Sequence, residues 1–287
     1  MMNVLWIFIG IFVVLVVVTW FFFRHWDRSI QRLGDQLEEE KRKEEAAQLV
    51  RKKEQVLRQT SEKALRKKIK LNDNLLQEMK TLQVSISGYS EMLTMTGEDY
   101  EEERNTLGQL IKNDVIRLMA ITNKMAELSH YELLGEVSLR DSVQVNALCH
   151  NVINGYQKMT EAGVKLIFEV GLTDDFMVHT NEECLVKILC HLLDAALRHT
   201  TEGSVTLTVT DDGRRDHVTL TISDTGNGIP KPYQSTVFED LPEVGSELKL
   251  TGLDLMISRT LVKLLGGIIF IDPHYEAGTR VVFDIKA

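Results

Sequence analysis

An uncharged apolar run lies near the start of the chain, ahead of long charged and alternating stretches. Residues 4–23 contain no charged side chain, and a helix needs roughly 20 residues to cross a ~30 Å hydrocarbon layer. Trp6 and Trp20 lie near the two ends of the run, where aromatic rings favour the membrane boundary. A signal peptide would carry cations before the run and small residues after it, and neither is present. The pattern therefore predicts a transmembrane helix at residues 4–23.

The cations after this run predict its orientation. Arg24 and Arg28 follow the apolar residues directly, and cations next to a membrane span are retained on the cytoplasmic side. We therefore expect a single-pass protein whose amino terminus lies outside the membrane and whose other domains lie in the cytoplasm.

The next stretch, residues 26–93, has the composition of a long exposed helix. It lacks proline and is dense in Glu, Lys, Arg and Gln. Apolar residues recur there at seven-residue steps, the repeat of a two-stranded coiled coil: Val50, Leu57, Ala64 and Leu71. We expect a coiled-coil linker at residues 24–61, with a slip of phase across residues 38–45. A solitary solvated helix is the alternative.

A helical hairpin is predicted for residues 62–134. Residues 95–100 contain Gly97, Glu98 and Asp99 and are typical of a turn. After them, apolar residues return at helical spacing: Leu107, Ile111, Leu118, Ile121, Met125 and Leu128. Two such helices cannot bury both apolar faces alone, so we expect a dimeric four-helix bundle with a second chain. The alternative is a hairpin that packs on the following domain of the same chain.

Residues 135–287 alternate between short strand patterns and helical patterns. Val, Ile, Thr and Phe alternate with other residues in the predicted strands, which are residues 165–170, 204–210, 217–223, 268–271 and 280–285. The predicted helices are residues 143–162, 182–199 and 253–265. Asp211, Asp212 and Gly213 predict a hairpin turn between the second and third strands. This mixture predicts an α/β sandwich, one mixed sheet covered by helices, and the whole chain is therefore of the α+β class.

Composition excludes some functions. The formal net charge of -9 gives no attraction for nucleic acid, and no basic face interleaved with aromatic residues overrides it. Cys149, Cys184 and Cys190 have no paired spacing and lie among apolar residues, which indicates reduced core thiols without a disulfide or a metal site.

Several motifs in the predicted sandwich carry a resemblance. Residues 224–230 read DTGNGIP and resemble the DxGxGIP box of sensor histidine kinases, where a carboxylate accepts a hydrogen bond from adenine and glycines allow close approach. Residues 189–200, LCHLLDAALRHT, resemble the NLLDNAxKxT helix of that family. Further matches are residues 237–239 with the phenylalanine box, residues 251–253 with the second glycine box, and residues 266–268 and 278–279 with the carboxy-terminal strands.

The resemblance covers residues 62–287 and implies an organisation and a site. It implies a dimerisation and histidine-phosphotransfer hairpin at residues 62–134 and a Bergerat-type ATP-binding domain at residues 135–287, anchored in the inner membrane of a bacterium. It also implies a response regulator as partner. The nucleotide-binding residues that it implies are Asp224, Gly226, Gly228, Arg198, Thr251, Gly252 and Thr279.

The phosphoacceptor position departs from the family. Residues 71–93 resemble the segment around the acceptor histidine, and the register set by residues 88–93 places Gln77 at that position. A neutral imidazole is nucleophilic at pH 7, whereas the lone pair of a carboxamide nitrogen is delocalised. We therefore expect no autophosphorylation at Gln77. His130, at the end of the second helix, lies too far along the chain to replace it.

The magnesium and phosphate positions also depart from the family. Two asparagines of the family's helix, one of which ligates magnesium, correspond to His191 and Ala195, which are poor ligands for an ion that prefers oxygen. Leu250 and Asp254 replace glycines of the second glycine box, and a carboxylate there should repel phosphates. We expect weak ATP binding with poor magnesium binding. An empty structural sandwich is the alternative.

Two residues beside Gln77 retain the family's HExxT pattern. In the family, the counterpart of Glu78 aids proton transfer, and the counterpart of Thr81 orients the water that hydrolyses the phosphoaspartate of a response regulator. Such a step needs a hydroxyl and a docked regulator but no nucleophilic histidine. The resemblance thus predicts a response-regulator phosphatase or docking partner, although Glu78 and Thr81 are also ordinary residues of a solvated helix.

Several alternatives remain open from the sequence. The chain could be an active kinase with a non-standard acceptor, or one that acts in trans. It could instead be a structural membrane protein whose coiled coil is the functional part. A dimer could be a homodimer or a heterodimer with an intact histidine kinase.

Overall fold

The structure, a computed structural model, describes most of the chain. The backbone is described for residues 2–96, 100–160, 162–173, 176–211, 217–239 and 246–286. Within these ranges, the side chains of residues 2–16, 25, 27–37 and 246–248 lie outside the description. The chain divides into two compact units, residues 1–66 and residues 67–287, which are described separately below.

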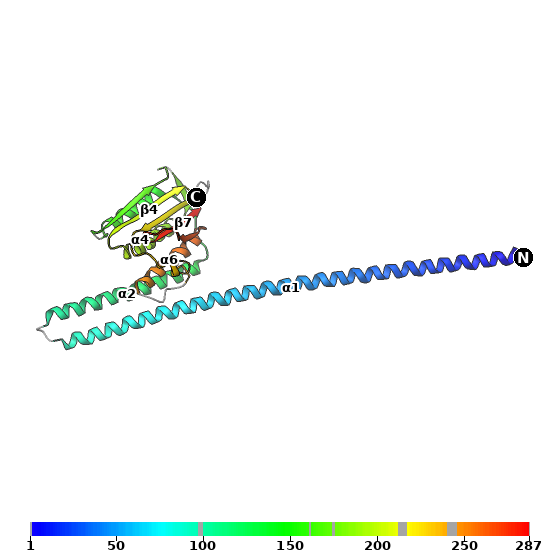
Figure 1. Ribbon diagram of the computed structural model, residues 1–287, viewed down its shortest axis with the longest axis horizontal. Helices are drawn as coiled ribbons and strands as arrows, with labels where there is room; N and C mark the ends of the chain where they lie inside the picture. Colours follow the sequence, from blue (N-terminus) through cyan, green and yellow to red (C-terminus); the bar gives the residue numbers. More distant parts are fainter. Residues whose placement is uncertain are drawn as a thin grey trace. The chain divides into compact units, whose positions relative to one another are not determined.

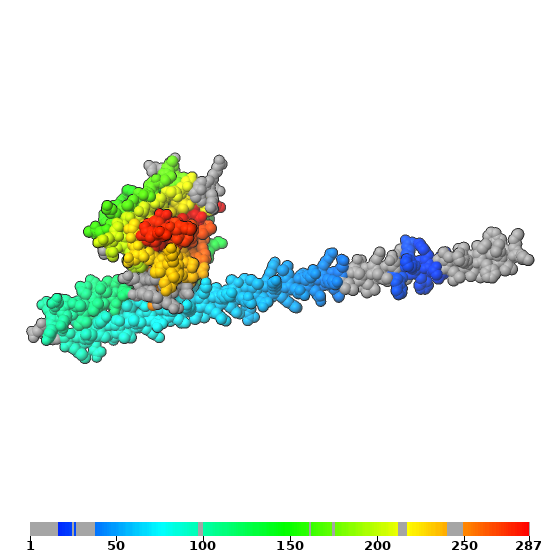
Figure 2. Space-filling view, viewed as in Figure 1, coloured from blue at the N-terminus to red at the C-terminus, as the bar shows by residue number. Residues whose placement is uncertain are grey.

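The first unit is the amino-terminal part of one long helix, α1 (Met2–Met95). The described side chains of residues 38–66 are exposed, including the heptad positions Val50 and Leu57 (Figure 2). Over the described residues, none of the helices is both long and apolar enough to span a membrane. Most of the predicted span at residues 4–23 lies outside the described side chains.

The second unit begins with a helical hairpin made of the end of α1 and α2 (Glu101–Leu134). The two helices lie side by side in Figure 1, and Lys68 Nζ of α1 lies 2.5 Å from Glu132 Oε2 of α2. The predicted break at residues 95–100 is confirmed, because α1 ends at Met95 and α2 begins at Glu101. The buried apolar residues of the hairpin are Leu71, Leu75, Leu82, Ile121, Leu128 and Tyr131.

The predicted mixed sheet is confirmed. Its five strands lie in the order β2-β4-β5-β7-β6, with only β2 and β4 parallel. The strands are β2 (Val164–Val170), β4 (Gly203–Asp211), β5 (His217–Asp224), β6 (Ile269–Ile271) and β7 (Arg280–Lys286). The residues of the predicted turn after Asp211 lie outside the described part of the chain.

Helices cover one face of this sheet (Figure 1). They are α3 (Val145–Gln157), α4 (Glu182–Arg198) and α6 (Ser246–Leu264), with a short α5 (Lys231–Gln234) before α6. In β4, Val205, Leu207 and Val209 are fully buried, and the threonines between them are half-buried on the other face. This period of two is the pattern of a sheet with one buried face and one face that is partly exposed to solvent.

Two helix boundaries and one small sheet differ from the sequence predictions. Helix α6 begins at Ser246 instead of residue 253, so Thr251 and Gly252 lie inside a helix. Helix α3 begins later than predicted, because residues 141–144 form β1 (Asp141–Gln144), which pairs with β3 (Met177–Thr180). These strands have four residues each, too few for a clear alternation of apolar and polar positions.

The three cysteines are free thiols in this structure. Cys149 and Cys184 are buried and Cys190 is half-buried. Burial raises the pKa of Cys149 to about 12, so this thiol stays protonated and unreactive at neutral pH.

Candidate functional site

Asp224, the last residue of β5, lies at the centre of the predicted nucleotide site. Its Oδ1 accepts N–H bonds from Gly226 (3.0 Å) and from Thr279 (3.1 Å), and its side chain is buried. Burial raises the pKa of this carboxyl, and the two N–H donors oppose that shift. Both bonds fall on Oδ1, so Oδ2 retains acceptor capacity for a ligand such as an adenine amino group.

The loop after Asp224 is fixed against the start of β7. Ile229 N donates to Thr279 Oγ1 over 2.9 Å, and Gly228 adopts a φ of 67°. That left-handed backbone region is strained for residues with a Cβ. At Gly226 a Cβ would collide with the backbone oxygen of His199, so this close approach also requires glycine. Gly226 therefore lets the loop approach the end of α4, and Gly228 lets it turn beside Gly278.

A narrow cavity lies between these residues and α6. Its walls include Asp224, Thr279, Thr251, Ala195 and His199. Its free volume of about 20 Å³ holds about one water molecule. A purine ring is larger than this free volume.

The predicted residues on the other wall bond to one another. Arg198 NH1 lies 3.1 Å from Thr251 Oγ1, and His199 Nε2 lies 2.7 Å from the same hydroxyl. Gly252 follows Thr251 and is buried inside α6. The structure thus brings the residues that the sequence predicted for nucleotide binding to the ends of β5, α4 and β7 and to one face of α6.

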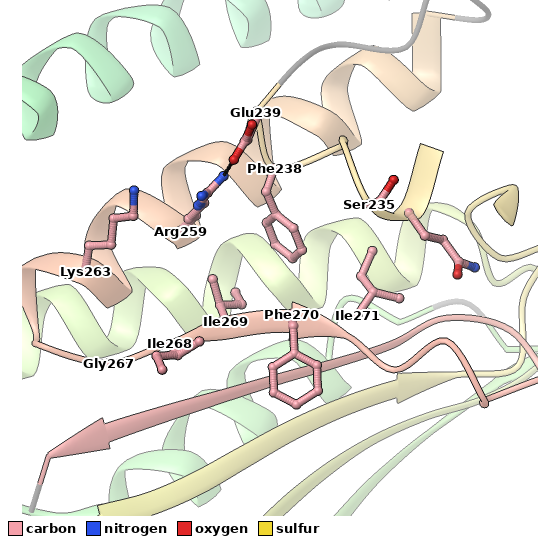
Figure 3. Close-up of a pocket in the computed structure, with 11 residues that line it drawn as sticks. Ser235, Phe238, Glu239, Arg259, Lys263, Gly267, Ile268, Ile269, Phe270 and Ile271 are labelled. Atoms are coloured by element: carbon pink, nitrogen blue, oxygen red, sulfur yellow. Dashed lines mark hydrogen bonds and ion pairs between the residues drawn. The ribbon is translucent and has the colours of Figure 1, made fainter. Parts of the chain in front are cut away.

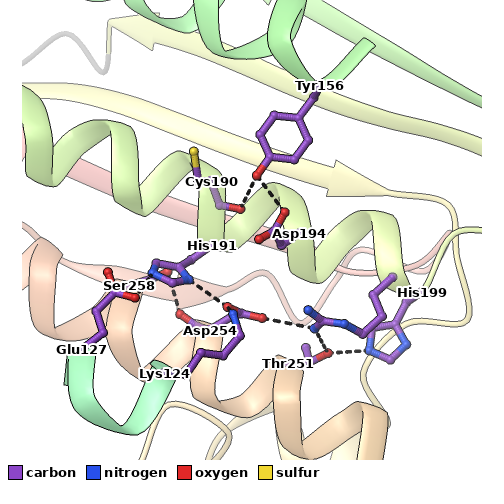
Figure 4. Close-up of polar contacts among 11 residues, drawn as sticks. Lys124, Glu127, Tyr156, Cys190, His191, Asp194, His199, Thr251, Asp254 and Ser258 are labelled. Atoms are coloured by element: carbon purple, nitrogen blue, oxygen red, sulfur yellow. Dashed lines mark hydrogen bonds and ion pairs between the residues drawn. The ribbon is translucent and has the colours of Figure 1, made fainter. Parts of the chain in front are cut away.

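Asp254 of α6 lies beside this wall at the centre of a buried ion network (Figure 4). Its side chain has no exposed surface. Oδ1 contacts Lys124 Nζ of α2 and lies 2.8 Å from His191 Nδ1, and Oδ2 lies 3.1 Å from Arg198 NH1. Three basic groups thus surround the carboxylate that the sequence predicted to repel phosphates, and they offset its charge.

His191 joins Asp254 to a second carboxylate. Its Nε2 lies 3.2 Å from Glu127 Oε2 of α2. Burial alone would lower the pKa of His191, but the bonds to Asp254 and Glu127 outweigh burial and raise it. The hydrogen bond from His191 lowers the pKa of Glu127. An imidazole with a carboxylate at each nitrogen is an imidazolium that donates both protons.

These contacts decide whether magnesium, which the fold family implies, fits this chain. Both nitrogens of His191 are engaged by carboxylates, and a protonated imidazole has no lone pair for a metal. Ala195, at the other predicted position, has no donor atom. Among the described residues, no cluster of His, Cys, Asp and Glu has the arrangement of a metal site. The residues present do not fit magnesium.

The three predicted residues of the hairpin have different surroundings. Gln77 is exposed, and Thr81 is exposed with its Oγ1 donating to the backbone oxygen of Gln77 over 3.0 Å. Glu78 is largely buried, and its Oε2 lies 2.8 Å from Lys249 Nζ of α6. Glu78 is thus fixed by the sandwich, while Thr81 faces solvent.

Residues 237–239, which resemble the phenylalanine box, border a separate groove of about 370 Å³ (Figure 3). Phe238 is buried there, opposite Ile269 and Ile271 of β6. Hydrogen bonds from Lys67 (2.6 Å) and Arg259 (2.8 Å) hold the pKa of Glu239 at about 2. These ion pairs fix the segment after α5 against α1 and α6.

The sequence predictions missed Lys124, Glu127 and Lys249. His191 and Asp254 are 63 residues apart and Lys124 and Asp254 are 130 apart, and helical periodicity carries no information about such pairs. The sequence held one indication of this ion network. Asp254 and His191 both replace uncharged residues, and the two motifs that contain them meet at one site in the family. Such a joint change favours a compensating contact.

Comparisons with known proteins agree with this geometry. Residues 180–287 match the family described as histidine kinase-, DNA gyrase B-, and HSP90-like ATPase. The virulence sensor protein BvgS of Bordetella bronchiseptica is 27% identical over 240 residues. That match covers 80% of this chain and 19% of BvgS, so the chain spans about a fifth of this relative.

Solved structures show the same fold. The histidine kinase ThkA, in complex with the response regulator protein TrrA, superposes with a TM-score of 0.61 at 19% identity, covering 75% of this chain and 60% of ThkA. Full-length ShkA in complex with AMPPNP gives a TM-score of 0.50 at 20% identity, covering 76% of this chain and 46% of ShkA.

Proposed function

We propose that this chain, which resembles sensor histidine kinases, is a signalling protein of a bacterial two-component system that does not phosphorylate itself at Gln77. In this proposal it is anchored in the inner membrane by residues 4–23, with its other domains in the cytoplasm. It acts on a response regulator as a phosphatase, as a docking scaffold, or as the partner of an intact kinase. The observation that carries the proposal is the carboxamide of Gln77 at the position of the acceptor imidazole.

The surroundings of Asp254 support the absence of kinase activity. Phosphoryl transfer from ATP depends on a cation that bridges and neutralises the phosphates. His191 and Ala195 supply no ligand for magnesium, and the site is narrow. Asp224 and its loop retain the geometry for an adenine ring, which supports weak nucleotide binding without efficient transfer.

The hairpin supports a role on a response regulator. Thr81 lies one helical turn after Gln77 and is exposed, so its hydroxyl is accessible to a docked protein. Hydrolysis of a phosphoaspartate needs a positioned water and no covalent intermediate on this chain. The TrrA complex of ThkA shows that a related fold contacts a response regulator, and we extend that partner class to this chain.

Exposed apolar residues of the hairpin support a dimer. Leu76, Val84, Ile116 and Met119 are large and at least half exposed in the single chain. Soluble surfaces rarely leave such residues together in water, and two hairpins that pack face to face would bury them. We propose a four-helix bundle, formed by two copies of this chain or by this chain and an intact kinase.

Two assays on the full chain in lipid nanodiscs test the proposal. With labelled ATP we expect no acid-labile phosphate, and recovery of such phosphate would establish a kinase with a non-standard acceptor. With a phosphorylated response regulator we expect a shorter phosphate lifetime. Thr81→Ala should abolish that shortening, and Thr106→Ala should not, because Thr106 is an equally exposed threonine with the same bond to its own helix.

Deletion of residues 135–287 tests the alternative that the chain is a structural membrane protein. A structural protein that acts through its coiled coil would keep its cellular function after this deletion. Loss of function, together with an effect on the regulator's phosphate, supports the signalling role.

A further inference from the structure

A buried carboxylate joins the hairpin to the sandwich. Asp254 has no exposed surface, and it contacts one cation from α2, Lys124, and two from α4, His191 and Arg198 (Figure 4). A buried carboxylate requires such partners, because removal of one leaves an uncompensated charge in a medium of low polarity. The contact between Lys124 and Asp254 is thus more than an incidental surface pair.

A second contact lies beside the first. In it the hairpin supplies the anion and the sandwich supplies the cation. Glu127, one helical turn after Lys124 on α2, accepts from His191 of α4. Lys187, also on α4, lies 3.6 Å from Glu127 and donates to the hydroxyl of Tyr131 on α2 over 2.5 Å. Each side of the interface therefore presents both a cation and an anion to the other side, which fixes register as well as affinity.

Two of these groups stand in segments that resemble nucleotide-binding motifs of the family. His191 lies on the helix that resembles the magnesium-binding motif, and Asp254 lies in the segment that resembles the second glycine box. In this chain Asp254 has three internal cations around it, one of them from the hairpin.

We propose that Asp254, His191, Lys124 and Glu127 form an electrostatic latch that fastens the sandwich to α2 and closes the phosphate side of the nucleotide site. In the latched arrangement Lys124, a cation tethered to the hairpin, lies against Asp254 in the segment that resembles the second glycine box. The arrangement of the two domains is then set by internal ion pairs, and nucleotide is not needed to maintain it.

The hairpin–sandwich interface combines these ion pairs with apolar contacts. Its described ion pairs include Glu78 with Lys249, and the buried apolar residues of the hairpin belong to the same core cluster as those of the sandwich. The inference concerns only this interface and holds whether or not the chain acts on a response regulator, so the tests below and the phosphatase assay can fail independently.

Hydrogen exchange on the full chain in nanodiscs tests the latch. In Lys124→Met we expect amides of residues 121–131 in α2 and 250–258 in α6 to exchange at least tenfold faster than in the unmodified chain. Glu132→Gln is the matched control, because Glu132 pairs with Lys68 inside the hairpin and should leave both segments unchanged. Equal exchange in Lys124→Met and the unmodified chain would overturn the proposal.

A second variant covers the case in which a single change prevents folding. The double substitution Lys124→Met with Asp254→Asn removes both charges. It leaves His191 paired with Glu127, and it leaves Arg198, whose side chain is 22% exposed, bonded to Thr251. We expect it to fold, to show the same fast exchange, and to bind a fluorescent ATP analogue at least tenfold more tightly than the unmodified chain. Slow exchange or unchanged affinity in a folded double variant contradicts the latch.

Discussion

Glu78 Oε2 lies 2.8 Å from Lys249 Nζ, so the residue next to Gln77 is tied to α6 of the sandwich. Both side chains are mostly buried, at 13% and 19% exposure. In this arrangement the Glu78 carboxylate neutralises a lysine of the sandwich. The position that resembles a catalytic residue therefore has a structural partner.

Loss of this ion pair should lower stability. Glu78→Gln leaves Lys249 without its counter-charge in a largely buried site, and we expect a cost of about 1–2 kcal/mol, between the values for exposed and fully buried pairs. Glu91→Gln, at an exposed glutamate of the same helix, should cost less than about 0.5 kcal/mol. Chemical denaturation of the two variants measures the difference, and equal costs would contradict a specific role for Glu78.

Restoration of the acceptor alone should not restore kinase activity. Gln77→His supplies an imidazole, but the nucleotide site still lacks metal ligands at His191 and Ala195. We expect labelled phosphate on the chain only when His191→Asn, Ala195→Asn and Asp254→Gly are added. Acid-labile phosphate in the single Gln77→His variant would show that the site already binds a metal nucleotide productively.

Asp224→Asn should separate ligand recognition from folding. The amide oxygen can still accept the N–H bonds of Gly226 and Thr279, so the loop should stay in place. The amide nitrogen, however, replaces an acceptor with a donor where an adenine amino group would approach. A hydrogen bond to a charged group contributes about 1.5–3 kcal/mol, so nucleotide affinity should fall by roughly tenfold or more. Titration with a fluorescent ATP analogue measures this, and unchanged affinity would exclude Asp224 from adenine binding.

The ion network predicts a stability that depends on pH in a definite direction. The pKa of His191 is raised above its usual value of 6.5, so its contribution is fully present below pH 6.5 and is lost as the pH rises through the higher pKa of the folded state. The pKa values of Glu127 and Asp254 are lowered from 4.5 and 3.8, so their contribution is present above those values and is lost as the pH falls.

Thermal unfolding between pH 5 and pH 9 tests this expectation. The melting temperature should fall on the alkaline side, and His191→Asn should remove that alkaline decline. His130→Asn is the control, because His130 is exposed and packs edge-on against Tyr131 without a carboxylate partner among the described contacts. An alkaline decline that persists in His191→Asn would assign it to another group.

The secondary structure of the sandwich could be predicted from its sequence, whereas the buried ion network could not. Alternation of Val and Thr in residues 204–210 predicted β4, and helical periodicity in residues 182–199 predicted α4. The start of α6 was placed too late because Thr251 and Gly252 resemble a loop motif, while packing against α2 and α4 keeps them helical. Tertiary contacts override local preference at such positions.

The ion network requires contacts between helices that periodicity alone does not reveal. Lys124 and Glu127 lie on α2 among apolar residues of the predicted core face, Met125 and Leu128. Charged residues at the edge of an apolar face are ordinary in an exposed helix, and only the packed structure shows that both face buried partners on the sandwich. The sequence could therefore predict the departure from the family but not its compensation.

The mutual dependence of these four charges constrains the evolution of the chain. Loss of one member leaves another with fewer counter-charges in a largely buried site. Breaking a buried pair costs about 3–5 kcal/mol, which is a large part of the stability of a typical domain. Single substitutions on the way to another arrangement would thus give less stable proteins. Selection for folding therefore acts on these residues as a group, whatever chemistry the nucleotide site performs.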